Sequence, residues 1–213
     1  PWQVNTYVMV VLQMLDDNGV AVAGLTSAED EPLPPRVIPE GLKKEDMTEA
    51  QIASFKLWKQ RSTKVYEENV RLRSKRMMTY RIRLMAEQFS VYSAIYFPHT
   101  ADFRGRLYPA SSYLTPQGNS LSKGLLKFAD GKPLGTNEAA VELAIHGANT
   151  FGYDKASMQE RVDWVVENQD RILQAGSDPM ADLWWAKEAD SPWCFLAFCE
   201  EWVGYNENGY DHV

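Results

Sequence analysis

The sequence predicts a mainly α-helical protein with one small β element. No Gly or Pro occurs between Thr48 and Pro98, which favours one long helix in that stretch. Apolar residues recur at helical spacing in most of the remaining chain. Only the residues between Ala94 and Tyr113 change to short β-prone runs, so the β element is expected there.

The first 47 residues predict one helix followed by a connector. Apolar residues at helical spacing precede a stop signal, Asp16-Asp17-Asn18-Gly19, and they are Val4, Val8, Val11, Leu12 and Leu15. Four prolines then deny backbone donors and bias their predecessors to extended conformations: Pro32, Pro34, Pro35 and Pro39. A helix within residues 1–19 and an irregular connector over 20–47 follow from these patterns.

The long helix begins with a capping signal and carries a concentrated positive charge. Thr48 followed by Gln51 is the arrangement in which a side chain and a backbone amide cap each other, so the helix is expected over 51–89, with a break possible near Arg73 to Met77. Ten basic and two acidic residues lie between Ile52 and Arg83, a local net charge of +8 against −7 for all 213 residues. This segment therefore suits phosphate binding, although the whole-chain charge does not.

The second half of the chain predicts a strand pair and then helices. Strands are expected at Ala94–Phe97 and Arg106–Tyr108. Helices are expected at 122–129, 137–150, 158–175, 179–187 and 192–203. Asp190-Ser191-Pro192 places a capping side chain directly before a proline, which is a strong signal for the start of the last helix.

Composition narrows the class of protein. The two cysteines, Cys194 and Cys199, lie in an apolar run at a spacing that suits neither a metal-ligand pair nor a disulfide scaffold, so we expect reduced core thiols. Three scattered histidines make no metal site. The apolar start is too short to span a bilayer and has no basic leader, and we expect a cytoplasmic protein without a membrane partner. A first residue that is Pro1 rather than Met predicts an excised or processed chain.

The run Asp102-Phe103-Arg104-Gly105-Arg106 is the clearest candidate for chemistry. Gly105 permits backbone conformations that other residues rarely adopt, and the flanking guanidinium groups match phosphate oxygens. The residues alone also allow an ordinary surface loop in which Asp102 pairs with an arginine. Both interpretations stay open on spacing alone.

These residues belong to a longer series that resembles the single-subunit DNA-dependent RNA polymerases of phages and mitochondria, and the phage enzymes most. The series runs through Phe97-Pro98, 102–108, 116–119, 123–126, 131–133, 146–149, Trp184-Trp185 and 190–199. Phe103 departs from the Trp often found in the family motif.

The resemblance implies a partial right-hand polymerase fold. It implies that 1–19 is the last helix of an N-terminal domain, 20–47 a connector, 48–89 the thumb helices, 90–130 the start of the palm with the Asp-x-x-Gly-Arg motif, and 131–213 a helical palm insertion. The implied nucleic-acid contacts are Asp102, Arg104, Gly105, Arg106, Tyr108, Gln117, Asn119, Lys123, Arg73, Lys75 and Arg76. A helix-capping role for the turn at 117–119 is a comparable alternative. Buried packing is favoured over base stacking for the tryptophans in 184–202.

The resemblance implies that the chain is part of an enzyme that carries out DNA-directed RNA synthesis. Within that enzyme, this segment is expected to grip template DNA and the RNA–DNA hybrid. Family members transfer nucleotides with two magnesium ions held by Asp residues in later motifs. No matching carboxylate pair occurs here, so we expect no catalytic or metal-binding residue in this chain and no polymerisation by it alone. The remaining palm and fingers would then come from the same or a second chain, in a phage-infected cell. Two alternatives are a small subunit of a split polymerase and a non-catalytic regulatory module that binds nucleic acid.

Overall fold

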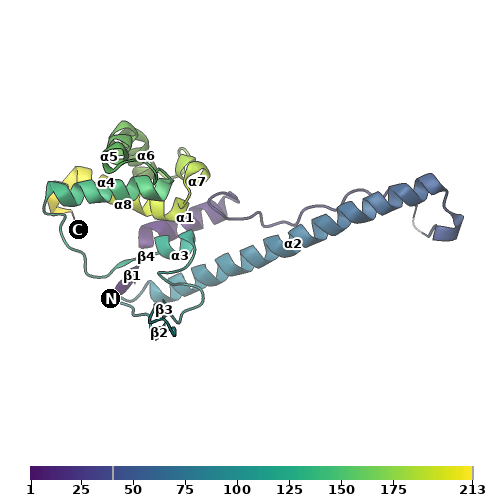
Figure 1. The fold of residues 1–213 in the computed structure, drawn as a ribbon, viewed down its shortest axis with the longest axis horizontal. Coiled ribbons are helices and arrows are strands. Elements are labelled where there is room, and N and C mark those ends of the chain that lie inside the picture. Colours follow the sequence, from purple (N-terminus) through teal and green to yellow (C-terminus); the bar gives the residue numbers. More distant parts are fainter. Residues whose placement is uncertain (40, 213) are drawn as a thin grey trace. The chain divides into compact units, whose positions relative to one another are not determined.

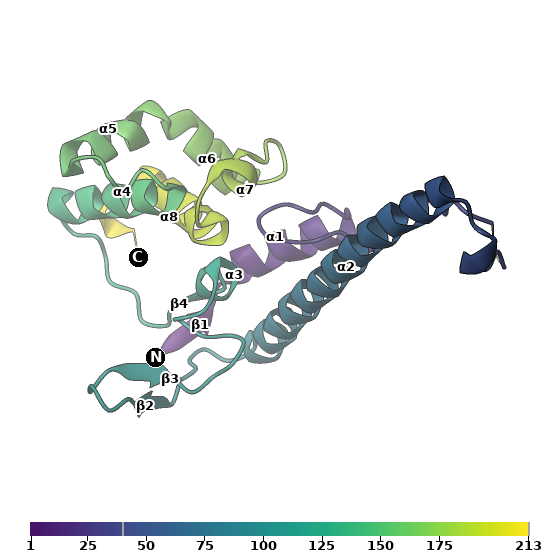
Figure 2. The same cartoon turned by 45° about the vertical axis from the view of Figure 1, so that its right-hand side comes forward.

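The computed structural model describes residues 1–39 and 41–212, and the chain divides into two compact units. One unit is Leu25–Thr79, and the other joins Pro1–Gly24 to Tyr80–Val213. The helices, shown in Figures 1 and 2, are α1 Thr6–Asp17, α2 Glu49–Phe89, α3 Ser120–Gly124, α4 Asn137–Phe151, α5 Met158–Glu167, α6 Gln169–Ser177, α7 Trp184–Glu188 and α8 Pro192–Asn208. Short 3-10 helices lie at Lys44–Asp46 and Gly209–Asp211, and the strands are β1 Trp2–Val4, β2 His99–Ala101, β3 Leu107–Pro109 and β4 Leu126–Phe128.

Helix α8 is the centre of the larger unit. It packs against α1, α3, α4, α6 and α7, and Figure 2 shows α4 and α7 beside it. Its buried residues cover more than one side of the helix, and they are Trp193, Phe195, Leu196, Phe198, Cys199 and Trp202. A helix that is apolar on so many sides is stable only when neighbours enclose it.

Aromatic rings fill the space between α8 and the surrounding helices. Phe151 lies 4.7 Å from Trp164 and 4.9 Å from Trp184 between ring centroids, and Trp184 meets Phe195 edge to face at 5.4 Å. The buried indole of Trp185 donates to the Pro179 carbonyl at 2.9 Å, which satisfies its polar atom. Trp184 and Trp185 are buried in the core, as predicted.

Two small antiparallel sheets lie in the same unit. Strand β1 pairs with β4, in the register Trp2↔Phe128 and Val4↔Leu126. Strand β2 pairs with β3, in the register His99↔Pro109 and Ala101↔Leu107. The protein is therefore mainly helical, as the sequence predicts, but it has two small antiparallel sheets where one β element was expected.

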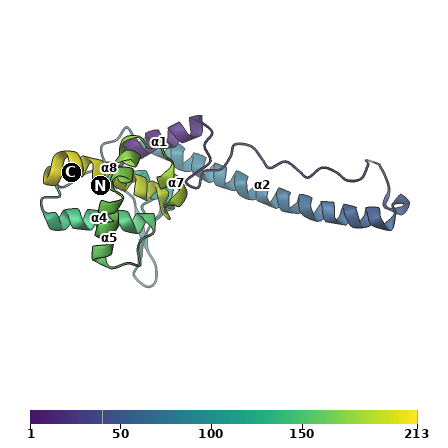
Figure 3. The ribbon, with the colours of Figure 1, turned by 90° about the horizontal axis from the view of Figure 1, so that it is seen from above.

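The smaller unit consists of the connector and most of α2. The predicted capping pair is present, because the Gln51 amide donates to Thr48 Oγ1 at 3.3 Å and Gln51 Oε1 accepts from the Thr48 amide at 2.8 Å. Residues 20–39 and 41–47 of the connector form no α-helix, and the connector runs alongside α2 (Figure 3). The Trp58 indole donates to the Pro34 carbonyl at 2.9 Å and fixes one point of this contact. The long helix is continuous, so the break considered near Arg73 to Met77 is absent.

Several elements in the first half of the chain differ from their predictions, because distant segments contact one another. Residues 94–97 form no strand, because the backbone of Ile95 instead exchanges two hydrogen bonds with Trp2. The predicted helix over 122–129 is only α3, after which 126–128 join β1 as a strand. Val4 belongs to β1, and α1 starts after Asn5, whose side chain caps it.

The second half contains three further differences and two agreements. The single helix predicted over 158–175 is two helices, α5 and α6, separated at Asn168, whose side chain donates to the Trp164 carbonyl at 2.8 Å. The helix predicted over 179–187 is confined to α7. Helix α8 begins at Pro192 as predicted, but the Ser191 side chain forms no capping bond. Helix α4 matches its prediction closely, and both cysteines are free thiols.

Replacing Gly124 with Ala tests the contact that holds α3 on α8. A Cβ atom at this position would lie 2.6 Å from the carbonyl oxygen of Trp193, a backbone atom that cannot rotate away. We expect Gly124→Ala to lower the free energy of unfolding by about 1–3 kcal/mol through overpacking, measured by urea denaturation. The exposed neighbour Lys123→Ala is the control and is expected to change it by less than about 0.5 kcal/mol. Equal stabilities for the two variants would contradict this packing.

Candidate nucleic-acid interface

The run 102–106 is the connecting loop of the β2–β3 hairpin. Ala101 and Leu107 are paired in the register, so the loop leaves and re-enters the sheet at adjacent points. Within it the Asp102 amide donates to the Arg106 carbonyl at 2.9 Å, and the Gly105 amide donates to the Asp102 carbonyl at 3.0 Å. The loop is thereby closed on itself and presents its side chains at one end of the hairpin.

The Asp102 carboxylate organises this loop from within. Its Oδ1 accepts from the amides of Arg104 at 2.8 Å and Arg106 at 2.9 Å. Its Oδ2 accepts from the Arg106 guanidinium, with Nε at 2.9 Å and Nη2 at 2.8 Å, and more distantly from the Tyr108 hydroxyl at 3.5 Å. A carboxylate that already receives these bonds has little capacity left for a ligand, so Asp102 positions its neighbours.

The same donors set the charge state of Asp102. They hold the pKa of its carboxyl below the usual value, chiefly because the Arg106 amide donates to it and further because the Arg106 guanidinium and the Arg104 amide also donate. Asp102 is therefore ionised at neutral pH and cancels the charge of Arg106 locally.

Gly105 supplies the turn that the loop needs. Its φ of +76° lies in the left-handed region, which residues with a Cβ atom seldom adopt. This conformation turns the chain so that both flanking amides reach the Asp102 carboxylate. Gly105 thus contributes shape to the loop and no side-chain contact.

Arg104 and Phe103 are the groups that the loop leaves available. The Phe103 side chain is 91% exposed, and the Arg104 guanidinium lies 5.2 Å from its ring centroid. Among the described residues, Arg104 has no hydrogen bond or ion pair through its guanidinium. Sequence reasoning included Arg104 but omitted Phe103, because exposure of an aromatic ring is not visible from its position in a motif.

Residues 115–119 form a turn that braces the hairpin and starts α3. The Gln117 side chain donates to the Leu107 carbonyl at 3.2 Å, and Asn119 Oδ1 accepts from the Ser122 amide at 2.9 Å. The capping alternative is therefore confirmed for Asn119, and Gln117 links the turn to β3. Lys123 lies on exposed α3 surface.

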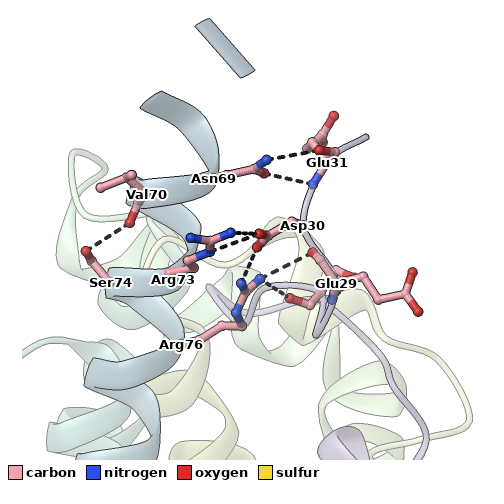
Figure 4. Close-up of polar contacts among 9 residues, drawn as sticks. Glu29, Asp30, Glu31, Asn69, Val70, Arg73, Ser74 and Arg76 are labelled. Atoms are coloured by element: carbon pink, nitrogen blue, oxygen red, sulfur yellow. Dashed lines mark hydrogen bonds and ion pairs between the residues drawn. The ribbon is translucent and has the colours of Figure 1, made fainter. Parts of the chain in front are cut away.

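A second group of predicted contacts lies on α2, in the smaller unit. Arg73 and Arg76 both bind the Asp30 carboxylate of the connector, with Arg73 Nε to Oδ2 at 2.9 Å and Arg76 Nη2 to Oδ1 at 2.6 Å (Figure 4). These two arginines hold the connector in this structure. Lys75, between them in sequence, is exposed and forms no ion pair with any of residues 1–39 and 41–212.

Lys75 belongs to a set of three cations on the exposed surface of α2, of which Arg61 and Lys64 were not singled out from the sequence. Arg61, Lys64 and Lys75 are separated by 3 and 11 residues, spacings that return to the same side of a helix. Arg71 lies on the same side but is bound by Glu68, with Nε to Oε2 at 2.7 Å. We define Arg61, Lys64 and Lys75 as the exposed cation row. The signal was present in the sequence as helical spacing combined with the absence of an acidic residue three or four positions away from Lys75.

The described part of the chain contains no group of three or more His, Cys, Asp and Glu side chains placed to hold a metal ion. In the same residues, no helix has the length and apolar character needed to cross a membrane.

Comparisons with known proteins agree with the resemblance seen in the motifs. Residues 132–211 match the family of DNA-dependent RNA polymerases. The chain is 36% identical over 213 residues to the DNA-directed RNA polymerase of Enterobacteria phage K11, covering all of this chain and 22% of that protein. It is 35% identical over 212 residues to T7 RNA polymerase of Escherichia phage T7, covering 99% of this chain and 23% of that protein. The mitochondrial DNA-directed RNA polymerase of Neurospora crassa is 34% identical over 204 residues, covering 94% of this chain and 13% of that protein. The chain thus spans about a fifth of the length of its phage relatives.

Replacing Asp102 with Asn tests whether its carboxylate organises the loop. The variant loses the charge that attracts Arg106, so we expect the Arg104 and Arg106 amides to exchange hydrogen severalfold faster, measured by NMR. Asp130→Asn, an exposed site beyond β4, is the control and should leave both amides unchanged. Because the folded pKa of Asp102 is lowered, the carboxylate's contribution is present above the ordinary value of 3.8 and is lost as pH falls through the lowered pKa. Unchanged exchange in Asp102→Asn would show that the loop holds its shape without this charge.

Proposed function

We propose that the chain is the part of a single-subunit DNA-directed RNA polymerase that grips template DNA and the RNA–DNA hybrid. The basis is that the chain is related along its whole length to such enzymes. The observation that carries the proposal is the loop at 102–106. Its carboxylate binds Arg106 and leaves the Arg104 guanidinium and the Phe103 ring free at the end of a hairpin.

Each loop residue has a distinct task in this proposal. Arg104 binds a backbone phosphate through its guanidinium. Phe103 offers an exposed ring on which a base or sugar packs, an interaction that tolerates any sequence. Asp102, Gly105 and Arg106 position these two groups, and Arg106 also lies over the Tyr108 ring at 5.7 Å from its centroid. Gln117 and Asn119 support the hairpin from the adjoining turn.

The exposed cation row of α2 is proposed to contact the nucleic-acid backbone as well. Three cations on one side of a helix follow a phosphate chain without reading its bases, which suits an enzyme that must hold every sequence. Lys123 adds a further charge on α3. This charge agrees with the assignment of 48–89 to the thumb, which rests on the resemblance to the polymerase family.

The remaining parts of the right hand are assigned by resemblance to the polymerase family. Residues 1–19 end an N-terminal domain, 20–47 are the connector, 90–130 begin the palm, and 131–213 form its helical insertion. Support for the last assignment is the family match over 132–211. The partners are then template DNA, the RNA–DNA hybrid, and the remaining palm and fingers, in the cytoplasm of a phage-infected cell.

Bond formation is assigned to residues outside this chain. Nucleotidyl transfer in this family suggests a divalent metal, proposed here to be magnesium, which neutralises charge on the reacting phosphates. The carboxylates in the described residues do not cluster into a site that fits such an ion. We therefore assign no catalytic step to this chain, and its share of the reaction is to hold the substrate strands.

The salt dependence of binding tests the role of Arg104. The affinity of the 213-residue chain for a short RNA–DNA hybrid should fall steeply as salt rises, measured by fluorescence anisotropy over a salt series. Arg104→Ala should weaken binding and reduce the slope of log K against log salt by about one, because one phosphate contact is lost. Lys155→Ala removes a charge from an exposed site between α4 and α5 and should leave the slope unchanged. Identical slopes for the two variants would refute the contact, and binding without salt dependence would refute the electrostatic grip.

A further inference from the structure

The connector is fastened to α2 by a short set of polar contacts (Figure 4). The Asn69 side chain accepts from the Glu31 amide at 2.8 Å and donates to the Glu31 carbonyl at 2.9 Å. Arg76 Nη1 donates to the carbonyls of Ser27 at 2.9 Å and Glu29 at 3.2 Å. With the Asp30 carboxylate, these bonds hold residues 27–31, which we define as the strap.

The Asp30 carboxylate lies where two guanidinium groups converge. Arg73 binds Oδ2 while Arg76 binds Oδ1, so both oxygens are engaged. Convergent guanidinium donors bind phosphate oxygens by the same geometry that binds carboxylate. Arg73 and Arg76 therefore form an oxyanion site, and the chain's own carboxylate fills it in this structure.

The ion pairs that join Asp30 to Arg73 and Arg76 form at neutral pH, but they are exposed to solvent and can open. Hydrogen bonds from Arg73, and then from Arg76, lower the pKa of Asp30 to about 2, so the carboxylate is ionised at neutral pH. The Arg73 side chain is 64% exposed and that of Asp30 is 30% exposed, which allows solvent and salt to compete. Trp58 holds Pro34 beyond the strap, so an opened strap stays attached to α2.

We propose that the strap is an internal competitor for nucleic acid, in which Asp30 occupies the place that a backbone phosphate of the RNA–DNA hybrid takes on Arg73 and Arg76. Glu29 and Glu31 flank Asp30 in the strap, but their side chains point away from the two arginines in Figure 4, so the Asp30 carboxylate alone occupies the site. Binding of the hybrid and docking of the strap then exclude each other at these two arginines. The identity of the ligand rests on the proposed function, whereas the opening of the strap by phosphate does not.

Asp30→Asn and Glu29→Gln form a matched pair of variants. Each removes one negative charge from the strap, but only Asp30 binds the two arginines through its side chain. We expect Asp30→Asn to bind the hybrid about two- to fivefold more tightly than Glu29→Gln at low salt, a ratio typical of losing an exposed ion pair. Equal affinities of the two variants for the hybrid would show that only the net charge of the strap matters. That result would overturn the proposed competition between Asp30 and a phosphate. Weaker binding by Asp30→Asn would overturn it as well, since the strap would then support the binding surface.

Hydrogen exchange of the peptide that covers residues 25–33, measured by mass spectrometry, follows the strap directly. In the wild-type chain we expect exchange to rise on adding saturating hybrid, toward the level of free Asp30→Asn. Bound hybrid with unchanged exchange would overturn the proposal.

Inorganic polyphosphate is the second probe, because it carries phosphate charge but no bases or sugars. We expect it also to raise exchange in residues 25–33 of the wild-type chain, at an ionic strength matched with chloride. If polyphosphate opens the strap but the chain does not bind the hybrid, the proposed function is refuted. The strap would then still compete with phosphate for Arg73 and Arg76. No opening with polyphosphate would overturn the competitor itself.

Discussion

The pairing of guanidinium groups with nearby carboxylates decides which cations of this chain stay unpaired and exposed to solvent. Arg106 is bound by Asp102, Arg71 by Glu68, and Arg73 and Arg76 by Asp30. Arg83 is bound by both Asp16 and Glu87. A paired guanidinium fixes the shape of a loop, a helix surface or a connector, whereas an unpaired one is ready for a phosphate. The basic stretch of the sequence is thus divided between cations that hold structure and cations that face solvent.

The fold was predictable where local signals were strong, and the prediction failed where distant segments pair. The Thr48–Gln51 cap and the proline-rich connector correctly indicated the start of α2 and the irregular chain before it. Residues 126–128 were predicted as part of a helix over 122–129, yet they pair with 2–4 at the start of the sequence. Local propensity carries no information about a partner so far away, and strand pairing depends on that partner.

The candidate site shows the same division. The motif at 102–106 located the loop, and the alternative in which Asp102 pairs with an arginine left the partner open, which the structure shows to be Arg106. The assignment of Arg73 and Arg76 rested on the charge of α2 and on the family resemblance, and their partner Asp30 lies more than 40 residues away along the chain. Phe103 was undervalued as a candidate contact because its 91% exposure is a property of the folded hairpin. Spacing therefore identified the loop, and only the three-dimensional contacts separated its ion-paired side chains from its exposed, unpaired ones.

Arginine footprinting tests this division most directly. Each arginine of the 213-residue chain would be labelled with phenylglyoxal, with and without a bound RNA–DNA hybrid, and quantified by mass spectrometry. We expect the hybrid to protect Arg104 on the hairpin and Arg61 in the exposed cation row, and to leave Arg83 unchanged because two carboxylates already bind it. A bound hybrid that leaves Arg104 and Arg61 fully reactive would contradict the claim that the unpaired cations form the grip.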